Sequence, residues 1–266
     1  MKKKYTMKDI AETCGVSTAT VSYVLNDAQN QSISAETKKH VLHIANMVGY
    51  VSSASAKALA TGRTHLIGVC VPYRSNAAGK QRLLQALAKE AEKAGYRLIL
   101  LTEKCLTQQV TDVDAVFAID LSEAEFSVLG NNSFVPLLYL DGLTDDDLFY
   151  CVRFDAQAIR ERALAQTGCK RAVLVAEPVQ CAAYRAYLEE CFDGVLTPAE
   201  AMSRSFAPDT AVLTAGELPV AAAHRLVLGS ADFPLDFAAY AQAAVRAAVK
   251  TINRDESPDE HQILVR

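Results

Sequence analysis

The residues near the N-terminus that are best suited to chemistry are short and uncharged: Thr18, Ala19, Thr20, Ser22 and Tyr23. Their spacing places them on the outward side of a short helix over 18–26. Hydroxyl and methyl groups on such a face can contact base edges and phosphates in a DNA groove. The pattern therefore predicts a helix that reads double-stranded DNA. The alternative is a helical hairpin that only packs.

Side-chain sets for catalysis or metal binding do not emerge from the rest of the chain. The seven cysteines form no Cys-x-x-Cys pair, so reduced and mostly buried thiols are expected. The histidines of the larger domain, His65, His224 and His261, are interpreted as surface or packing residues. No Gly-rich phosphate loop and no Ser/His/Asp set stands at a suitable place. We expect no enzymatic activity, no cofactor and no metal.

Two helices joined by a tight turn must position the outward face. Thr6 can cap the first helix with Asp9 completing a capping box, Gly15 can end it with a positive φ, and Ser17 can cap the second. The apolar contact between these helices is expected at Ile10, Ala11, Val16, Val21 and Leu25. A third helix is expected from Ser34 to Gly49, with an apolar stripe at Val41, Leu42, Ile44, Ala45 and Val48.

Several short motifs occur in order over the first seventy residues. They are Asp9-Ile10-Ala11, Gly15-Val16-Ser17, Thr20-Val21-Ser22, Val24-Leu25-Asn26, Val41-Leu42, Gly49-Tyr50, Ala56-Lys57-Ala58-Leu59 and Thr64-His65-Leu66-Ile67-Gly68-Val69. With these motifs the chain resembles the lac repressor family of bacterial transcription regulators.

The resemblance implies a homodimeric repressor on a pseudo-palindromic double-stranded operator. The helix Thr18–Asn26 would enter the major groove, and the hinge Ser53–Ala60 would lie in the minor groove with Leu59 as a wedge. The residues carried over as DNA contacts are Thr6, Ser17, Thr18, Ala19, Thr20, Ser22, Tyr23, Asn26, Tyr50, Ala56, Lys57 and Leu59.

The charge distribution agrees with this organisation. Residues 1–64 hold eight Lys or Arg and four Asp or Glu, a net charge of +4, whereas the remainder carries −8 within a total of −4. A basic segment attracts DNA phosphates, and an acidic remainder repels them, so DNA binding is expected only at the basic segment. We predict a DNA-binding domain over 1–51, a hinge helix and linker over 52–64, and an effector-binding and dimerisation core over 65–266.

From residue 66 the chain alternates apolar strands with amphipathic helices, which is typical of a parallel α/β sheet. Strands are expected over 66–72, 96–101, 115–119, 137–140, 172–175, 211–214 and 225–228, and helices over 81–94, 156–166, 219–224 and 237–252. The predicted fold is an all-α helix-turn-helix head joined by a hinge helix to a two-lobed, periplasmic-binding-protein-like α/β core.

The resemblance also implies a ligand site in the core, at Tyr73, Asp141 and Asp155. Yet Ala183, Gly216-Glu217 and Ala231 stand where the family has charged ligand-binding groups, and the core is short. Two interpretations stay open: control by a small-molecule effector, or a core that has lost this response and serves dimerisation or a protein partner. No apolar run is long enough for a membrane helix and no signal peptide is visible, so we expect a cytoplasmic protein without membrane contact.

Overall fold

The computed structural model describes residues 5–25, 32–48, 50, 62–72, 77–215, 236–255 and 261–266. The chain divides into two compact units, Met1–Thr64 and His65–Arg266, and each is described by itself. The expected hinge helix over 52–64, and the helix and strand expected over 219–228, lie almost wholly or wholly outside the described residues.

The first unit contains three helices around one small core. They are α1 (Met7–Cys14), α2 (Thr18–Leu25) and α3 (Ala35–Met47). Each packs on the other two, and their buried side chains are Ile10, Ala11, Val21, Val24, Val41 and Ala45. The predicted stripe on α3 is wrong at Leu42, which is 45% exposed, because the α3 side chains that enter the core are Val41 and Ala45, one helical turn apart.

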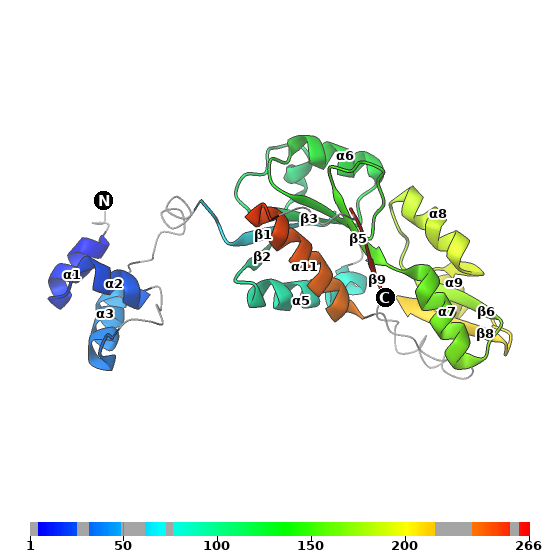
Figure 1. The fold of residues 1–266 in the computed structure, drawn as a ribbon, viewed down its shortest axis with the longest axis horizontal. Helices are drawn as coiled ribbons and strands as arrows, with labels where there is room; N and C mark the ends of the chain where they lie inside the picture. The colour runs from blue at the N-terminus through cyan, green and yellow to red at the C-terminus, as the bar shows by residue number, and fades with distance from the viewer. Residues whose placement is uncertain are drawn as a thin grey trace. The chain divides into compact units, whose positions relative to one another are not determined.

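The second unit is built on two parallel sheets (Figure 1). Its elements are β1 (Leu66–Cys70), α5 (Ala77–Lys93), β2 (Arg97–Leu101), η1 (Glu103–Leu106), β3 (Ala115–Ile119), α6 (Glu123–Asn132), β4 (Leu137–Leu140), β5 (Tyr150–Phe154), α7 (Ala156–Thr167), β6 (Arg171–Ala176), α8 (Ala182–Cys191), β7 (Gly194–Leu196), α9 (Pro198–Met202), β8 (Thr210–Ala215), α11 (Phe237–Asn253) and β9 (Gln262–Val265).

The first lobe has the larger sheet, with strand order β2-β1-β3-β4-β5-β9. Strands β3 and β4 are buried at every residue, as expected for parallel strands covered on both faces. Helices α5 and α11 pack against each other, and α11 also contacts β4, β5 and β9. Figure 1 shows α6 on the other side of this sheet.

The second lobe lies between β5 and α11 in the sequence. Its sheet has the order β7-β6-β8, and α7 and α8 pack beside it. Helix α7 begins at the Asp155 cap and ends at Gly168, whose φ of 70° is the left-handed conformation that glycine adopts without strain. The predicted parallel two-lobed core is therefore confirmed.

Candidate nucleic-acid interface and ligand pocket

The tight turn of the first unit is fixed by side-chain caps at the starts of α1 and α2 and by a glycine at the end of α1. The Thr6 side chain accepts the amide of Asp9 at 3.3 Å, while the Thr6 amide donates to the Asp9 carboxylate at 2.7 Å. Gly15 has a φ of 66° and ends α1, as predicted. Ser17 then accepts the amide of Thr20 at 3.0 Å and begins α2. These caps fix the direction in which α2 leaves the turn.

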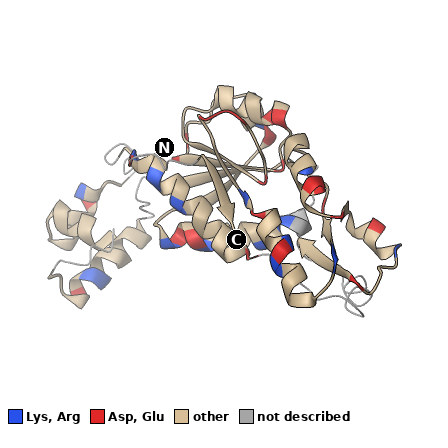
Figure 2. Ribbon diagram, turned by 45° about the vertical axis from the view of Figure 1, so that its right-hand side comes forward, with Lys and Arg blue, Asp and Glu red and all other residues tan. Residues whose placement is uncertain are grey.

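Helix α2 presents an uncharged polar face to solvent. Its sequence has no Lys, Arg, Asp or Glu, so no blue or red falls on this helix in Figure 2, whereas α1 and α3 both carry charged residues. Thr18, Ala19 and Tyr23 are exposed, with Tyr23 at 41%, whereas Thr20 and Ser22 are half-buried. The three exposed side chains can therefore reach a partner without any change in the helical core.

The remaining predicted contacts lie at the edges of this unit or outside the described residues. Thr6 and Ser17 are exposed, and both hydroxyl groups already serve as helix caps. Tyr50 is half-buried against the three-helix core, and its amide donates to the carbonyl of Ala45 at 2.8 Å. Four more predicted contacts fall outside the described residues: Asn26, Ala56, Lys57 and Leu59.

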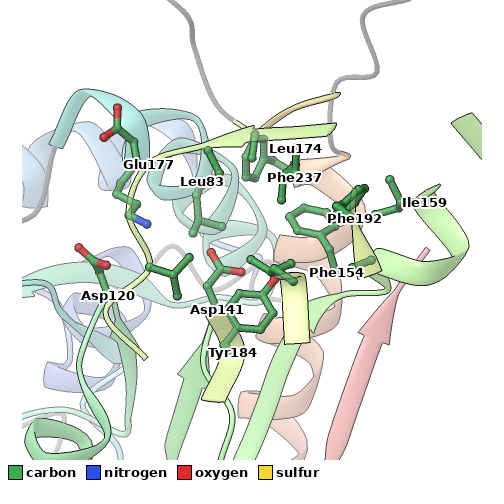
Figure 3. A pocket seen from close by; sticks show the side chains of 16 residues that line it. Leu83, Asp120, Asp141, Phe154, Ile159, Leu174, Glu177, Tyr184, Phe192 and Phe237 are labelled. Atoms are coloured by element: carbon green, nitrogen blue, oxygen red, sulfur yellow. The ribbon is translucent and has the colours of Figure 1, made fainter. Parts of the chain in front are cut away.

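The second unit contains a pocket with one charged and one apolar side (Figure 3). Its charged lining consists of Lys80, Asp120, Asp141 and Glu177, and its aromatic lining consists of Phe154, Tyr184, Phe192 and Phe237. The cavity measures about 80 Å³.

Asp120 and Asp141 occupy equivalent places in the first lobe. Each directly follows a buried strand, β3 or β4, and each has a left-handed backbone, with φ values of 58° and 52°. Because parallel strands end at the same edge of a sheet, both carboxylates reach the pocket together, as Figure 3 shows. Sequence reasoning singled out Asp141 and missed Asp120, although the same strand-then-Asp pattern marks both.

Asp141 is held by Tyr240 of α11. The Tyr240 hydroxyl lies 3.0 Å from Asp141 Oδ1 and 2.9 Å from the Asp141 amide, which donates to it. Burial raises the pKa of Asp141, while Lys80 and the hydrogen bond from Tyr240 act in the opposite direction. Burial therefore disfavours the charged form of this carboxylate, and Lys80 and Tyr240 offset that effect only in part.

Replacing Asp141 by Asn is expected to raise the melting temperature at pH 7. Proton binding to a group with a raised folded pKa stabilises the folded state below the unfolded pKa, and this contribution is lost as pH rises. The amide is neutral, can still accept from Tyr240 and tolerates the left-handed backbone. The gain should disappear below about pH 4, the ordinary pKa of Asp.

Thermal melts of the wild type and Asp141→Asn over a pH series measure this effect. Asp145→Asn, at an exposed position, is the matched control and should leave the melting temperature unchanged at each pH. A variant less stable than the wild type at pH 7 would contradict the assigned burial cost.

The other predicted ligand residues do not join Asp141. The carboxylate of Asp155 caps α7 through the amide of Ala158 at 3.1 Å and binds Arg266 at 3.0 Å, and Asp155 is not among the residues that line the pocket. Tyr73, Gly216 and Ala231 lie outside the described residues. Ala183 is exposed, and its amide donates to Glu123 at 2.8 Å.

Neither a candidate metal cluster nor a candidate membrane span occurs among the described residues. No group of three or more His, Cys, Asp or Glu residues among them is arranged to hold a metal ion. None of the helices in the described part of the chain has the length and apolar character that crossing a membrane requires.

Comparisons with known sequences give matches of unequal extent. Residues 6–53 match the family described as bacterial regulatory proteins, lacI family. The fructose operon regulatory protein of Vibrio cholerae is 28% identical over 159 residues, which cover 55% of this chain and 48% of that protein. The sucrose operon repressor of Klebsiella pneumoniae is 44% identical over 75 residues, covering 28% of this chain and 22% of that repressor.

The HTH-type transcriptional repressor PurR of Pasteurella multocida is 26% identical over 185 residues, covering 64% of this chain and 54% of that protein. The chain thus spans about half the length of such relatives, or less.

Solved structures support the fold over a longer stretch. The lac repressor dimer bound to operator and the anti-inducer ONPF aligns with a TM-score of 0.64 and 18% identity, covering 99% of this chain and 96% of that one. The transcriptional regulator CelR in complex with cellobiose aligns with a TM-score of 0.54 and 16% identity, covering 98% of this chain and 97% of that one. At these identities the likeness extends to the fold alone.

Proposed function

We propose that this chain is a regulatory protein of the lacI family, which its residues 6–53 match, and that it represses transcription as a homodimer bound to a specific operator. The observation that supports the proposal is the exposed, uncharged polar face of α2, fixed by the Thr6, Gly15 and Ser17 turn. A helix of this kind fits the major groove, where hydroxyl and methyl groups meet base edges. The excess of basic residues over 1–64 supplies phosphate attraction.

Two arguments support the proposed dimer: the two-fold symmetry of operators and the similarity of the fold to that of the lac repressor. One head contacts one half-site, and two heads related by a two-fold axis require a pseudo-palindromic operator. The solved lac repressor is described as a dimer bound to operator. Residues 52–64 are assigned as the hinge, and Ala56, Lys57 and Leu59 as its minor-groove contacts, by resemblance.

The test begins with selection of a binding site from random DNA by the full-length protein. Fluorescence anisotropy on the selected operator is then measured between 50 and 200 mM salt. If two heads neutralise about six phosphates, the logarithm of the association constant should fall with the logarithm of salt concentration with a slope of about −5. Failure to enrich any sequence, or an affinity independent of salt, would overturn the proposal.

Tyr23 is proposed to set part of the half-site preference, because it is the largest exposed side chain on α2. Tyr23→Arg should change the preferred base at one symmetric position, since a guanidinium can bind guanine through two hydrogen bonds and a phenol cannot. The discrimination expected per base pair is about 1–3 kcal/mol, or about tenfold to a hundredfold. Parallel selections with both proteins measure the change.

Met47→Arg is the matched control for Tyr23→Arg. Met47 is 70% exposed on α3, so the substitution adds the same charge on a different helix. It should strengthen binding to all sequences alike and leave the half-site unchanged. Identical half-sites for the wild type and Tyr23→Arg would remove Tyr23 from base recognition.

Control of the repressor by a small molecule is the finer part of the proposal. A compact apolar effector is proposed over a sugar, because Ala183, Gly216 and Ala231 replace charged ligand-binding groups expected from the family. The three phenylalanines of the pocket offer such a ligand an apolar wall, opposite the charged groups of its other side. A ligand can release the operator only if it binds the two arrangements of the protein with different affinity.

The second candidate is a core without small-molecule response that serves dimerisation or a protein partner. It is supported by the exposed Ala183, which cannot supply the charge that sugar hydroxyls require. A thermal-shift and operator-release screen over sugars, sugar phosphates, nucleobases and small apolar metabolites separates the two. A compound that stabilises the core and releases operator supports the first candidate, and a sugar that does so would overturn the expected ligand class.

A further inference from the structure

Two buried thiols lie in contact at the edge of the first lobe. Cys70 is the last residue of β1 and Cys105 lies in the short helix η1, and their sulfur atoms are 3.0 Å apart. Cys70 is 2% exposed and Cys105 is 7% exposed. Thirty-five positions separate them in the sequence, so the fold and not local spacing brings them together.

The two sulfur atoms have unequal surroundings. The hydrogen bond between the two sulfur atoms, in which either can donate, raises the pKa of Cys70 and lowers that of Cys105. Backbone N–H groups of Cys105 and Leu106 also favour a negative charge on the Cys105 sulfur. The thiolate is the reactive form of cysteine, so Cys105 is the nucleophile of the pair and Cys70 its neighbouring thiol.

The geometry points to a reversible oxidation site: we propose that a hydroperoxide converts Cys70 and Cys105 into a disulfide within the first lobe. The Cys105 thiolate attacks one peroxide oxygen, the O–O bond breaks, and the leaving hydroxide takes a proton to become water. The Cys70 sulfur then attacks the sulfenic acid, the S–S bond forms and the S–O bond breaks, releasing a second water. Two thiols lose two electrons, and one hydrogen peroxide becomes two water molecules.

The local structure permits the approximately 1 Å approach that a disulfide of about 2.05 Å requires. Element η1 is only four residues long, and Cys105 is its one buried residue, with Glu103 and Lys104 exposed beside it. A surface turn of this kind can shift more easily than a central strand. A small oxidant needs to reach only Cys105, the more exposed of the two residues.

The crosslink would close a loop that contains α5 and β2. Helix α5 carries Lys80 and Leu83, which line the pocket, and β1 ends at the sheet edge where Asp120 and Asp141 follow β3 and β4. Oxidation would therefore tie the end of β1, at Cys70, to η1, at Cys105. This inference does not depend on the proposed function, because it concerns the thiols of the core.

The experiment treats the reduced, full-length protein with stoichiometric hydrogen peroxide, followed by thiol alkylation and peptide mapping without reductant. The expected result is a monomer lighter by about 2 Da with Cys70 and Cys105 peptides crosslinked, restored by dithiothreitol. The oxidised core should melt about 5 °C or more above the reduced core, because the crosslink restricts the unfolded chain.

Variants assign the two roles. Cys70→Ser should accumulate a dimedone adduct on Cys105, Cys105→Ser should give none on Cys70, and Cys169→Ser, a partly exposed control, should form the disulfide as the wild type does. Oxidation of other cysteines without a Cys70–Cys105 crosslink, or a dimedone adduct on Cys70, would overturn the proposal. If a variant does not fold, the peptide map of the wild type decides alone.

Discussion

Replacing Val21 by Asp is expected to abolish operator binding while the core of the protein melts as before. Val21 is fully buried where α2 packs on α1 and α3. An unpaired charge at such a position costs several kcal/mol. A three-helix unit of this size has little stability to spare, so the head should unfold.

Two measurements separate this effect from a general loss of folding. Anisotropy reports operator binding, and calorimetry reports the melting of residues 65–266, which form a compact unit of their own. Val21→Ile is the matched control, because it keeps an apolar β-branched side chain and should retain binding. Operator affinity within twofold of the wild type for Val21→Asp would contradict the assigned helical core.

Replacing Gly142 by Ala should have the largest effect on the core. A Cβ at this position would lie 2.3 Å from two ring atoms of Tyr139. That ring is fully buried, stacks on Phe126 with centroids 4.0 Å apart, and donates its hydroxyl to the Leu121 carbonyl at 2.6 Å. Since the ring has no free direction of movement, we expect a loss of about 3 kcal/mol or more.

Gly194→Ala is the control for this substitution. Its Cβ would meet Val173 at 3.8 Å, an ordinary van der Waals contact, so the variant should melt close to the wild type. Chemical denaturation of both variants measures the difference in unfolding free energy. Equal stability of Gly142→Ala and Gly194→Ala would show that the first lobe adjusts around Tyr139 more freely than its packing implies.

The caps and fully buried strands were the elements that the sequence could predict. Strands β3 and β4 occur at the predicted residues. A short, continuous apolar run bounded by polar residues is typical of a strand that is covered on both faces of a parallel sheet. The Thr6 capping box and the Gly15 turn are local, so neighbouring residues alone determine them. Both predictions were confirmed.

Elements stabilised by distant partners were missed. Strand β9 has four residues and pairs with β5, with Cys151 opposite Gln262, so no local signal identifies it. The apolar run of strand β5 is interrupted by Arg153, whose guanidinium packs over the Tyr187 ring at 4.8 Å. Helix α6 contains Gly130 and two asparagines, but its Ser122 and Glu125 capping box was a usable signal.

The ligand pocket was predicted only in part, for the same reason. Asp141 was found because it follows an apolar strand. Lys80 and Glu177 also line the pocket, but they come from distant parts of the sequence, and no local sequence pattern indicates that these parts meet. Asp155 also follows a strand, but it begins a helix, and the need of α7 for a cap determines its contacts. Helix α2 and its exposed residues were predicted more completely, because the three-helix unit is compact and its contacts are short-range.

The first lobe contains strands from both ends of the second unit, and this has a consequence for synthesis on the ribosome. The second lobe is one uninterrupted stretch between β5 and α11 and can close as soon as it has emerged. The first lobe must wait for α11, whose Tyr240 reaches Asp141 across 99 positions, and for β9. Until then the β5 edge stays open, and such edges invite pairing with other nascent chains. Delayed completion of the first lobe would therefore be the step at which chaperones matter most for this protein.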